Sequence, residues 1–148
     1  MKIALGADHG GYLLKDALKK YLSDLGHEVE DLGTNGPGRV DYPDYARLVG
    51  EVVAAGRAER GVLVCGTGIG ISIAANKIRG IRAALVSSVT TARLAAEHNN
   101  ANVLCLGGRL IAEPLAAEIV QTWLDTDFES RHQPRLDKIA MLERPGER

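Results

Sequence analysis

The residues with the clearest chemical potential follow a short apolar run near the middle of the chain. Cys65 ends the run Val62-Leu63-Val64 and is followed directly by Gly66-Thr67-Gly68-Ile69-Gly70. Glycines that open a helix let successive backbone N–H groups face an anion, and the helix N-terminus adds partial positive charge. The same positive end favours the thiolate form of a neighbouring cysteine. Two interpretations remain open: a nucleophile or general base beside an anion site, or a small hydrophobic residue before a packing turn.

The glycine loop does not match two common nucleotide-binding motifs. A Walker loop requires a Gly-Lys-Ser/Thr sequence, which is absent after Gly70. A dinucleotide fingerprint requires a final glycine where this chain has Ile71, and an acidic residue where it reads Val86-Ser87-Ser88. The loop therefore favours a smaller anion over a nucleotide.

Other polar groups also follow apolar runs. Asp8-His9 is a compact acid–base pair, and Gly10-Gly11 after it indicates close approach of backbone to another group. The later polar groups are His98-Asn99-Asn100, Arg109, and Arg131 and Arg135 on either side of His132. Each has an ordinary interpretation: a helix cap, a helix C-terminus, or a solvated charge. The last pair equally suits a phosphate clamp.

Alternating patterns predict the elements that must position these residues. Strand-like runs cover 2–6, 27–32, 62–65, 82–86 and 103–106, and a helical pattern follows each of them. Strict alternation predicts an α/β fold with a doubly wound five-stranded parallel sheet, in the Rossmann/flavodoxin-like order 2-1-3-4-5. The more polar segment 125–148 predicts a C-terminal helical arm with a short helix after Pro134. Ligands bind where strands 1 and 3 end, which is where Asp8 and Cys65 are expected.

Size and composition limit the classes of protein. With 148 residues, 45% of them apolar, we expect one domain over residues 1–148. A formal charge of -1 disfavours nucleic acid and anionic membrane as partners. No apolar run reaches the length of a membrane span and no signal-peptide pattern is present, so we expect a cytoplasmic protein. Two cysteines and four scattered histidines lack metal-site spacing, so we expect no metal.

Taken in order, the motifs resemble the ribose-5-phosphate isomerase type B family, which includes the galactose-6-phosphate isomerase subunits. The resemblance covers nearly the whole chain. It is carried by the segments Asp8-His9-Gly10-Gly11, Asp41-Tyr42-Pro43-Asp44-Tyr45, Cys65-Gly66-Thr67-Gly68-Ile69-Gly70, Ile73-Ala74-Ala75-Asn76-Lys77, His98-Asn99, Gly107-Gly108-Arg109 and Arg131-His132-Gln133-Pro134-Arg135.

The resemblance implies interconversion of an aldose phosphate and its ketose isomer through a cis-enediolate, without metal or organic cofactor. Cys65 resembles the base that moves the proton between C1 and C2. Some family members instead use a glutamate in the loop, but Ile71 stands in this loop and cannot transfer protons. The enediolate oxygens would be stabilised by the Thr67 side chain and by the backbone amides of Gly66, Gly68, Ile69 and Gly70.

The other motif positions imply substrate contacts. His98 resembles the residue that opens the furanose ring, with Asp8 beside it at the sugar hydroxyls and Asn99 as a further contact. The set expected toward the phosphate end is His9, Arg109, Arg131 and Arg135. The resemblance also implies a homodimer or dimer of dimers with shared active sites, in which the arm packs at a subunit interface.

Ribose 5-phosphate and ribulose 5-phosphate are the expected pair. One alternative keeps the chemistry on a galactose or allose 6-phosphate or a tetrose 4-phosphate. Another alternative is a non-catalytic phosphosugar-binding module, which would have no use for Cys65 or His98.

Overall fold

Strands and helices alternate along the chain, as predicted, in a computed structural model that describes residues 1–144. The strands are β1 (Lys2–Ala7), β2 (Glu28–Asp31), β3 (Arg60–Cys65), β4 (Ala83–Leu85) and β5 (Val103–Gly107). The helices are α1 (Tyr12–Asp24), α2 (Tyr42–Ala54), α3 (Ile69–Ala75), α4 (Val89–Glu97), α5 (Glu113–Asp125) and α6 (Gln133–Leu142), with a 3-10 turn η1 (Ser130–His132) before α6. All strand pairs are parallel, which confirms the predicted fold class.

The strand order is β2-β1-β3-β5-β4, so the predicted order 2-1-3-4-5 is wrong for the last two strands. β5 is buried along its whole length and pairs with β3 in the middle of the sheet. β4 has only three residues and ends at the exposed Leu85, which suits an edge. A strand covered on both faces must be apolar throughout, and of the two only β5 meets that demand. The neighbouring pair β1 and β3, where ligands were expected, is unchanged.

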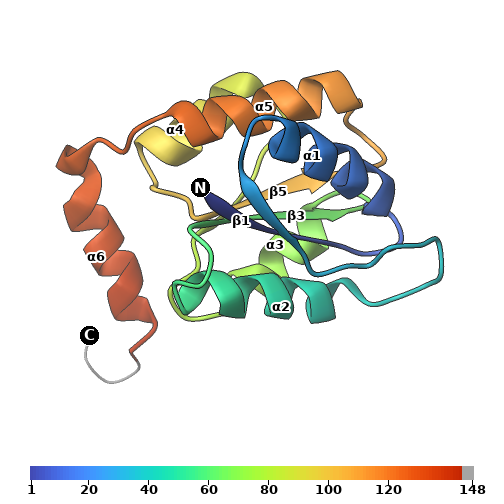
Figure 1. Cartoon of the computed structure of the whole chain (residues 1–148). Coiled ribbons are helices and arrows are strands. Elements are labelled where there is room, and N and C mark those ends of the chain that lie inside the picture. The colour runs from blue at the N-terminus through green and yellow to red at the C-terminus, as the bar shows by residue number, and fades with distance from the viewer. Residues whose placement is uncertain (145–148) are drawn as a thin grey trace.

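Two apolar layers cover the sheet (Figure 1). One is formed by α1, α4 and α5 and includes Leu18, Ile119 and Trp123, whose indole N–H donates to the Ala101 carbonyl. The other is formed by α2 and α3 and includes Val49 and Ile71. Because the strands between these layers are all parallel, the loops that follow them emerge at the same end of the sheet.

A glycine and a proline mark the ends of two helices. Gly26, at a φ of +91°, ends α1, because a left-handed backbone stops a helix at low cost only in glycine. Pro43 lies in the first turn of α2, where its missing N–H is not needed. Among the described residues, no helix is long and apolar enough to cross a membrane. A cytoplasmic location stays a prediction.

The C-terminal arm lies beside the amino ends of the strands (Figure 1). Leu136 is its buried apolar contact, and the Glu143 carboxylate accepts the Gly80 N–H at 3.0 Å. The same helix leaves Ile139 and Leu142 exposed. The arm helix predicted after Pro134 is confirmed, with its start at Gln133. Residues 145–148 of the predicted arm lie outside the described residues.

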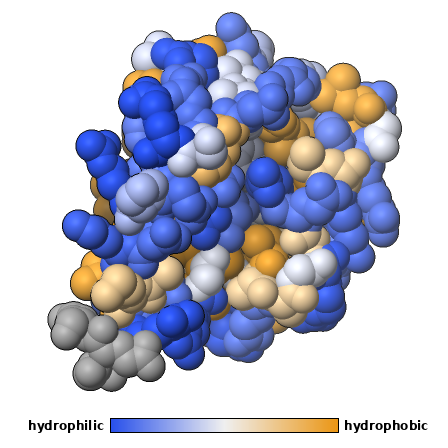
Figure 2. Space-filling view, turned by 90° about the vertical axis from the view of Figure 1, so that its left-hand side faces the viewer, coloured by the Kyte–Doolittle hydropathy of each residue, from blue (hydrophilic) through white to orange (hydrophobic). Residues whose placement is uncertain are grey.

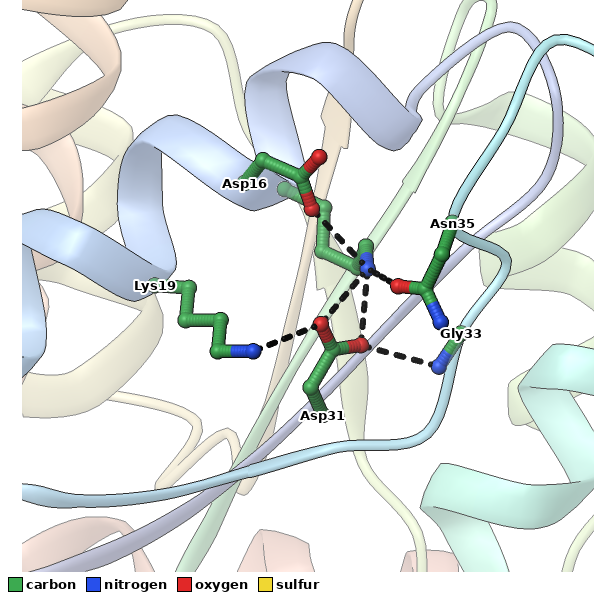
Figure 3. A network of polar contacts seen from close by, with 6 residues as sticks. Asp16, Lys19, Asp31, Gly33 and Asn35 are labelled. Carbon is green, nitrogen blue, oxygen red and sulfur yellow. Dashed lines mark hydrogen bonds and ion pairs between the residues drawn. The ribbon is translucent and has the colours of Figure 1, made fainter.

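A buried lysine joins α1 to the loop that follows β2 (Figure 3). The Lys15 side chain is fully buried, and its ammonium donates to both Asp31 carboxylate oxygens, at 2.7 and 2.9 Å, and to Asn35 at 2.7 Å. Lys19 adds a weaker contact to Asp31 at 3.3 Å, and the Gly33 N–H donates to the same carboxylate. The network thus holds the end of β2 and the loop after it against α1.

We expect Lys15→Met to lower the free energy of unfolding by roughly 3 kcal/mol, because it leaves the Asp31 carboxylate buried beside only Lys19. Denaturant unfolding at a fixed protein concentration measures the change. Lys20→Met is the matched control, since its ion pair with Asp24 is exposed and such pairs contribute little. Equal losses in the two variants would contradict this account.

The same network predicts a pH dependence. Burial acts to raise the pKa of Asp31, but the hydrogen bonds from Lys15 and Gly33 and the charge of Lys15 hold it below its ordinary value. A lowered folded pKa adds stability above the unfolded value of about 3.9, and this stability is lost as pH falls through the folded pKa. We expect the stability gap between wild type and Asp31→Asn to be constant down to about pH 5 and to close below about pH 4. Unfolding curves measured across this range test it, and a gap that widens in acid would be inconsistent with it.

Candidate active site

Three loops meet at the carboxyl ends of β1, β3 and β5. The Gly108 N–H donates to the Cys65 carbonyl at 2.8 Å, and the Arg109 N–H donates to the Gly66 carbonyl at 3.1 Å. A Cβ atom at Gly108 would lie only 2.8 Å from the Gly10 carbonyl oxygen, so the first and last loops touch through glycine backbone. The prediction that the segments after the first and third strands converge is confirmed. The third loop joins them because β5, and not β4, lies beside β3.

Cys65 lies at the centre of this junction. Its sulfur accepts the Gly68 N–H at 3.1 Å, and Gly68 has a left-handed φ of +79° that a side chain would strain. The Ile69 N–H donates to the Thr67 hydroxyl at 3.2 Å. Two of the four amides expected to stabilise the enediolate therefore already have partners inside the loop. Cys65 is only 4% exposed, so the uncovered thiol that a base requires is not seen in the single chain.

Asp8 and His9 leave β1 beside this loop. Asp8 is buried, and its carboxylate accepts the Gly10 N–H at 2.8 Å. It does not cap α1, whose N-cap is Gly11. His9 Nδ1 lies 3.2 Å from both the Val40 N–H and its carbonyl oxygen, so the loop after β2 fixes the imidazole. Hydrogen bonds thus hold both side chains in place at the junction. The alternative that Asp8 caps the following helix is wrong.

Arg109 and Tyr42 border the glycine loop. A Cβ atom at Gly66 would lie 3.0 Å from an Arg109 guanidinium nitrogen, which places this exposed cation over the loop backbone. Arg109 has no carboxylate partner within residues 1–144, so its charge is available to an anion. A Cβ at Gly70 would lie 2.5 Å from the Tyr42 ring. The sequence motif included Tyr42, but the sequence assigned it no role.

The remaining predicted residues lie at the opposite end of the sheet. His98 and Asn99 end α4, which runs antiparallel to the strands and therefore finishes at their amino ends. Arg131 and Arg135 belong to η1 and α6, whose approach to α4 includes a hydrogen bond from the Glu129 N–H to the Glu97 carbonyl. Within one chain, the structure thus does not bring His98 to Asp8, or Arg131 and Arg135 to His9. Their grouping in one site, which the resemblance places across a subunit boundary, stays a prediction.

A histidine pair forms the centre of this second group. The His98 and His132 rings lie 4.5 Å apart between centroids, and Arg131 donates to the Glu129 carboxylate at 2.6 Å. Burial, followed by the charges of Arg131, His98 and Arg135, lowers the pKa of His132. The hydrogen bond from Arg131 lowers the pKa of Glu129. At neutral pH the group therefore holds a neutral imidazole beside a carboxylate.

A hollow of about 500 Å³ opens on the face that carries α6. Figure 2 looks onto this side of the molecule and shows hydrophobic surface among hydrophilic side chains. Asn99 lines the hollow, together with Ile81 from the sheet side and Ile139 and Leu142 from α6. None of the residues at the Cys65 junction lines it.

Cys105 contrasts with Cys65. It is fully buried within β5, and burial raises the pKa of its thiol far above the ordinary value. Cys105 is therefore a packing residue of the core.

A comparison with protein-family models decides the family. The model for ribose/galactose isomerases matches residues 3–139, which include both groups of candidate residues. The chain belongs to the ribose/galactose isomerase family. It is a sugar-phosphate isomerase of the aldose–ketose type, as the motifs implied.

Individual relatives agree over nearly the full length. Ribose-5-phosphate isomerase B of Escherichia coli is 47% identical over 143 residues, covering 96% of each chain. The structure of ribose-5-phosphate isomerase B from Mycoplasma genitalium with bound ribulose-5-phosphate is 42% identical, covers 97% of each chain, and has a TM-score of 0.93. D-erythrulose-4-phosphate isomerase of Pectobacterium atrosepticum is 41% identical over 145 residues, covering 97% of this chain and 95% of that protein. The relatives therefore differ in the sugar that they are named for.

Proposed function

We propose that this chain interconverts ribose 5-phosphate and ribulose 5-phosphate, as a cytoplasmic enzyme that needs no metal. The observation that carries the proposal is the contact of the Cys65 sulfur with the Gly68 N–H, at the junction of three backbone loops. It supports a thiol beside amide donors at the edge of the sheet where ligands bind in such folds. The similarity to two relatives named for ribose 5-phosphate supports the choice of sugar.

In the proposed reaction, the Cys65 thiolate removes the proton from C2 of the open-chain aldose. The electron pair forms a C1–C2 double bond, and negative charge develops on the oxygens of the enediolate. Cys65 then returns the proton to C1, while a proton moves between the two oxygens to leave the ketose. Access to the sulfur requires the Gly66–Gly70 loop to shift, because the thiol is buried in the single chain.

Fixed donors explain why a metal is not needed in this proposal. Amides directed at developing charge are commonly the largest contribution to such catalysis. Within the described chain, the N–H groups of Gly66 and Gly70 have no partner, and those of Gly68 and Ile69 are held by Cys65 and Thr67. The side chain of Arg109 above Gly66 adds a positive charge.

We also propose that a second copy of the chain completes each site. His98, Asn99, Arg131 and Arg135 lie at the far end of the sheet from Cys65, so one chain does not assemble the set. The hollow beside α6 and the exposed Ile139 and Leu142 offer apolar surface for a second copy. A homodimer that places these residues over the neighbouring Cys65 junction accounts for both features, and a dimer of dimers would repeat it.

Substrate choice tests the proposed sugar. We expect the highest kcat/KM with ribose 5-phosphate, compared with allose 6-phosphate, galactose 6-phosphate and erythrose 4-phosphate, because the Escherichia coli relative at 47% identity is named for it. An isomerase assay across this panel measures it. A higher kcat/KM with a hexose or tetrose phosphate would select an alternative with the same chemistry. Binding without turnover of any sugar would indicate the non-catalytic module.

Removing the base tests the mechanism. We expect Cys65→Ala to lower kcat by about 10²–10⁴-fold, the range for a lost general base, with only a modest loss of phosphosugar affinity. Steady-state kinetics and ligand titration measure the two effects. Cys105→Ala is the matched control and should keep kcat, because Cys105 is buried away from the loops. Unchanged turnover in Cys65→Ala would remove Cys65 from the mechanism.

Mixed dimers test the shared site. Cys65→Ala and His98→Ala should each be nearly inactive alone. Coexpression with two different tags isolates the mixed dimer, in which one of the two sites retains both residues. We expect about half of the wild-type activity if sites are shared across a two-fold interface. No recovery in a verified mixed dimer would show that each site is formed within one chain.

A further inference from the structure

We propose that His98, Glu129 and His132 form a binding site for a divalent transition-metal cation such as Zn²⁺, and that the bound cation inhibits the isomerase. The binding part stands on the geometry of these three residues. The inhibition part rests on the role of His98 in the proposed function.

The three side chains already converge. One ring nitrogen of each histidine and one carboxylate oxygen of Glu129 lie within 4.8 Å of one another. Tetrahedral Zn²⁺ with bonds of about 2.0–2.1 Å places its ligand atoms roughly 3.4 Å apart. Movements of about an ångström in these side chains are sufficient to bring the three ligand atoms to that spacing. Two histidines and one carboxylate also match the ligand types of open zinc sites, which leave a position for water.

His132 supplies a second and independent observation. Its side chain is only 8% exposed, and its Nε2 atom is buried without a hydrogen-bond partner. Buried polar atoms in folded proteins nearly always have a partner. The nearest carboxylate oxygen, on Glu129, is 3.8 Å from Nε2, which is too far for a hydrogen bond. A cation between the two would give His132 Nε2 the partner that it lacks.

The surrounding charges permit a cation here. Arg131 is positive but is paired with Glu129 at 2.6 Å. Glu97 places a carboxylate oxygen 3.4 Å from His98 Nε2, and its other oxygen binds Arg93. Arg135 is the remaining positive group close enough to affect His132. Two carboxylates therefore face the histidine pair and offset the charges of Arg131 and Arg93.

Metal binding would interfere with the reaction in a defined way. A cation on His98 occupies the nitrogen lone pair that proton transfer during ring opening requires. It also draws Glu129 away from Arg131. The histidines are therefore expected to hold either a metal or the sugar phosphate, and a chelator should reverse the inhibition.

The test of binding is a calorimetric titration of the wild-type protein with ZnCl₂, in a buffer without phosphate or chelator and without sugar. We expect saturable binding at one site per chain. His132→Gln and Glu129→Gln should each weaken binding at least about tenfold, since even indirect support of a metal ligand is commonly worth that much. Glu129 is partly exposed, so its variant tests the site even if His132→Gln does not fold.

Two controls separate this site from other ligands. Cys65→Ser and His27→Gln should bind Zn²⁺ as the wild type does, because neither residue belongs to the cluster. Co²⁺ bound to the wild-type protein should show no sulfur-to-metal charge-transfer band, which would indicate Cys65 as ligand. No binding, unchanged affinity in both cluster variants, or loss of binding in Cys65→Ser would overturn the site.

The test of inhibition is the isomerase assay with added ZnCl₂, followed by EDTA. We expect inhibition that EDTA reverses, and at least about tenfold more Zn²⁺ to be needed for half-inhibition of Glu129→Gln. Binding without inhibition would overturn the inhibitory role and leave the site. Because the titration contains no sugar, failure of the proposed function in the substrate panel would not alter the binding result.

Discussion

The length of the central strands keeps the two groups of candidate side chains apart. β3 has six residues and β5 has five. At about 3.3 Å per residue, the amino and carboxyl ends of these strands lie roughly 16–20 Å apart. Helices pack both faces of these strands, and no rotamer change spans that distance. The packed core therefore fixes Cys65 at the carboxyl ends of the strands and His98 at their amino ends. One chain therefore carries two separate groups of polar residues, one at each end of the strands.

Local patterns predicted most of the fold, because each strand and helix carries its own apolar period and its own stop signals. The order of the last two strands was wrong because both runs looked alike as strands. Only their relative burial separates them, and the charged Arg82 at the start of the predicted run 82–86 was the available sequence signal. The buried Lys15 was not predicted either. A lysine in a helix is ordinarily solvated, and nothing local shows that Asp31 and Asn35 will reach it.

The site was predicted in its parts and not in its arrangement. The motifs drew attention to Cys65, His98 and the arginines, and their roles stay predictions. Spacing along the chain does not indicate at which end of the strands a helix finishes. The direction of α4 decides that for His98. The contact between His98 and His132 had no sequence signal, since it depends on how the segment after α5 returns to α4.

The arm has a consequence for how this scaffold diversifies. Arg131 and Arg135 stand on a short turn and helix that contact the rest of the chain through a few groups, among them His132, Leu136 and Glu143. Substitutions there would alter the charge and shape of the arm while the sheet, and the sulfur at its carboxyl end, keep their packing. In a family whose members are named for several sugars, the arm is a segment that can vary without disturbing the core.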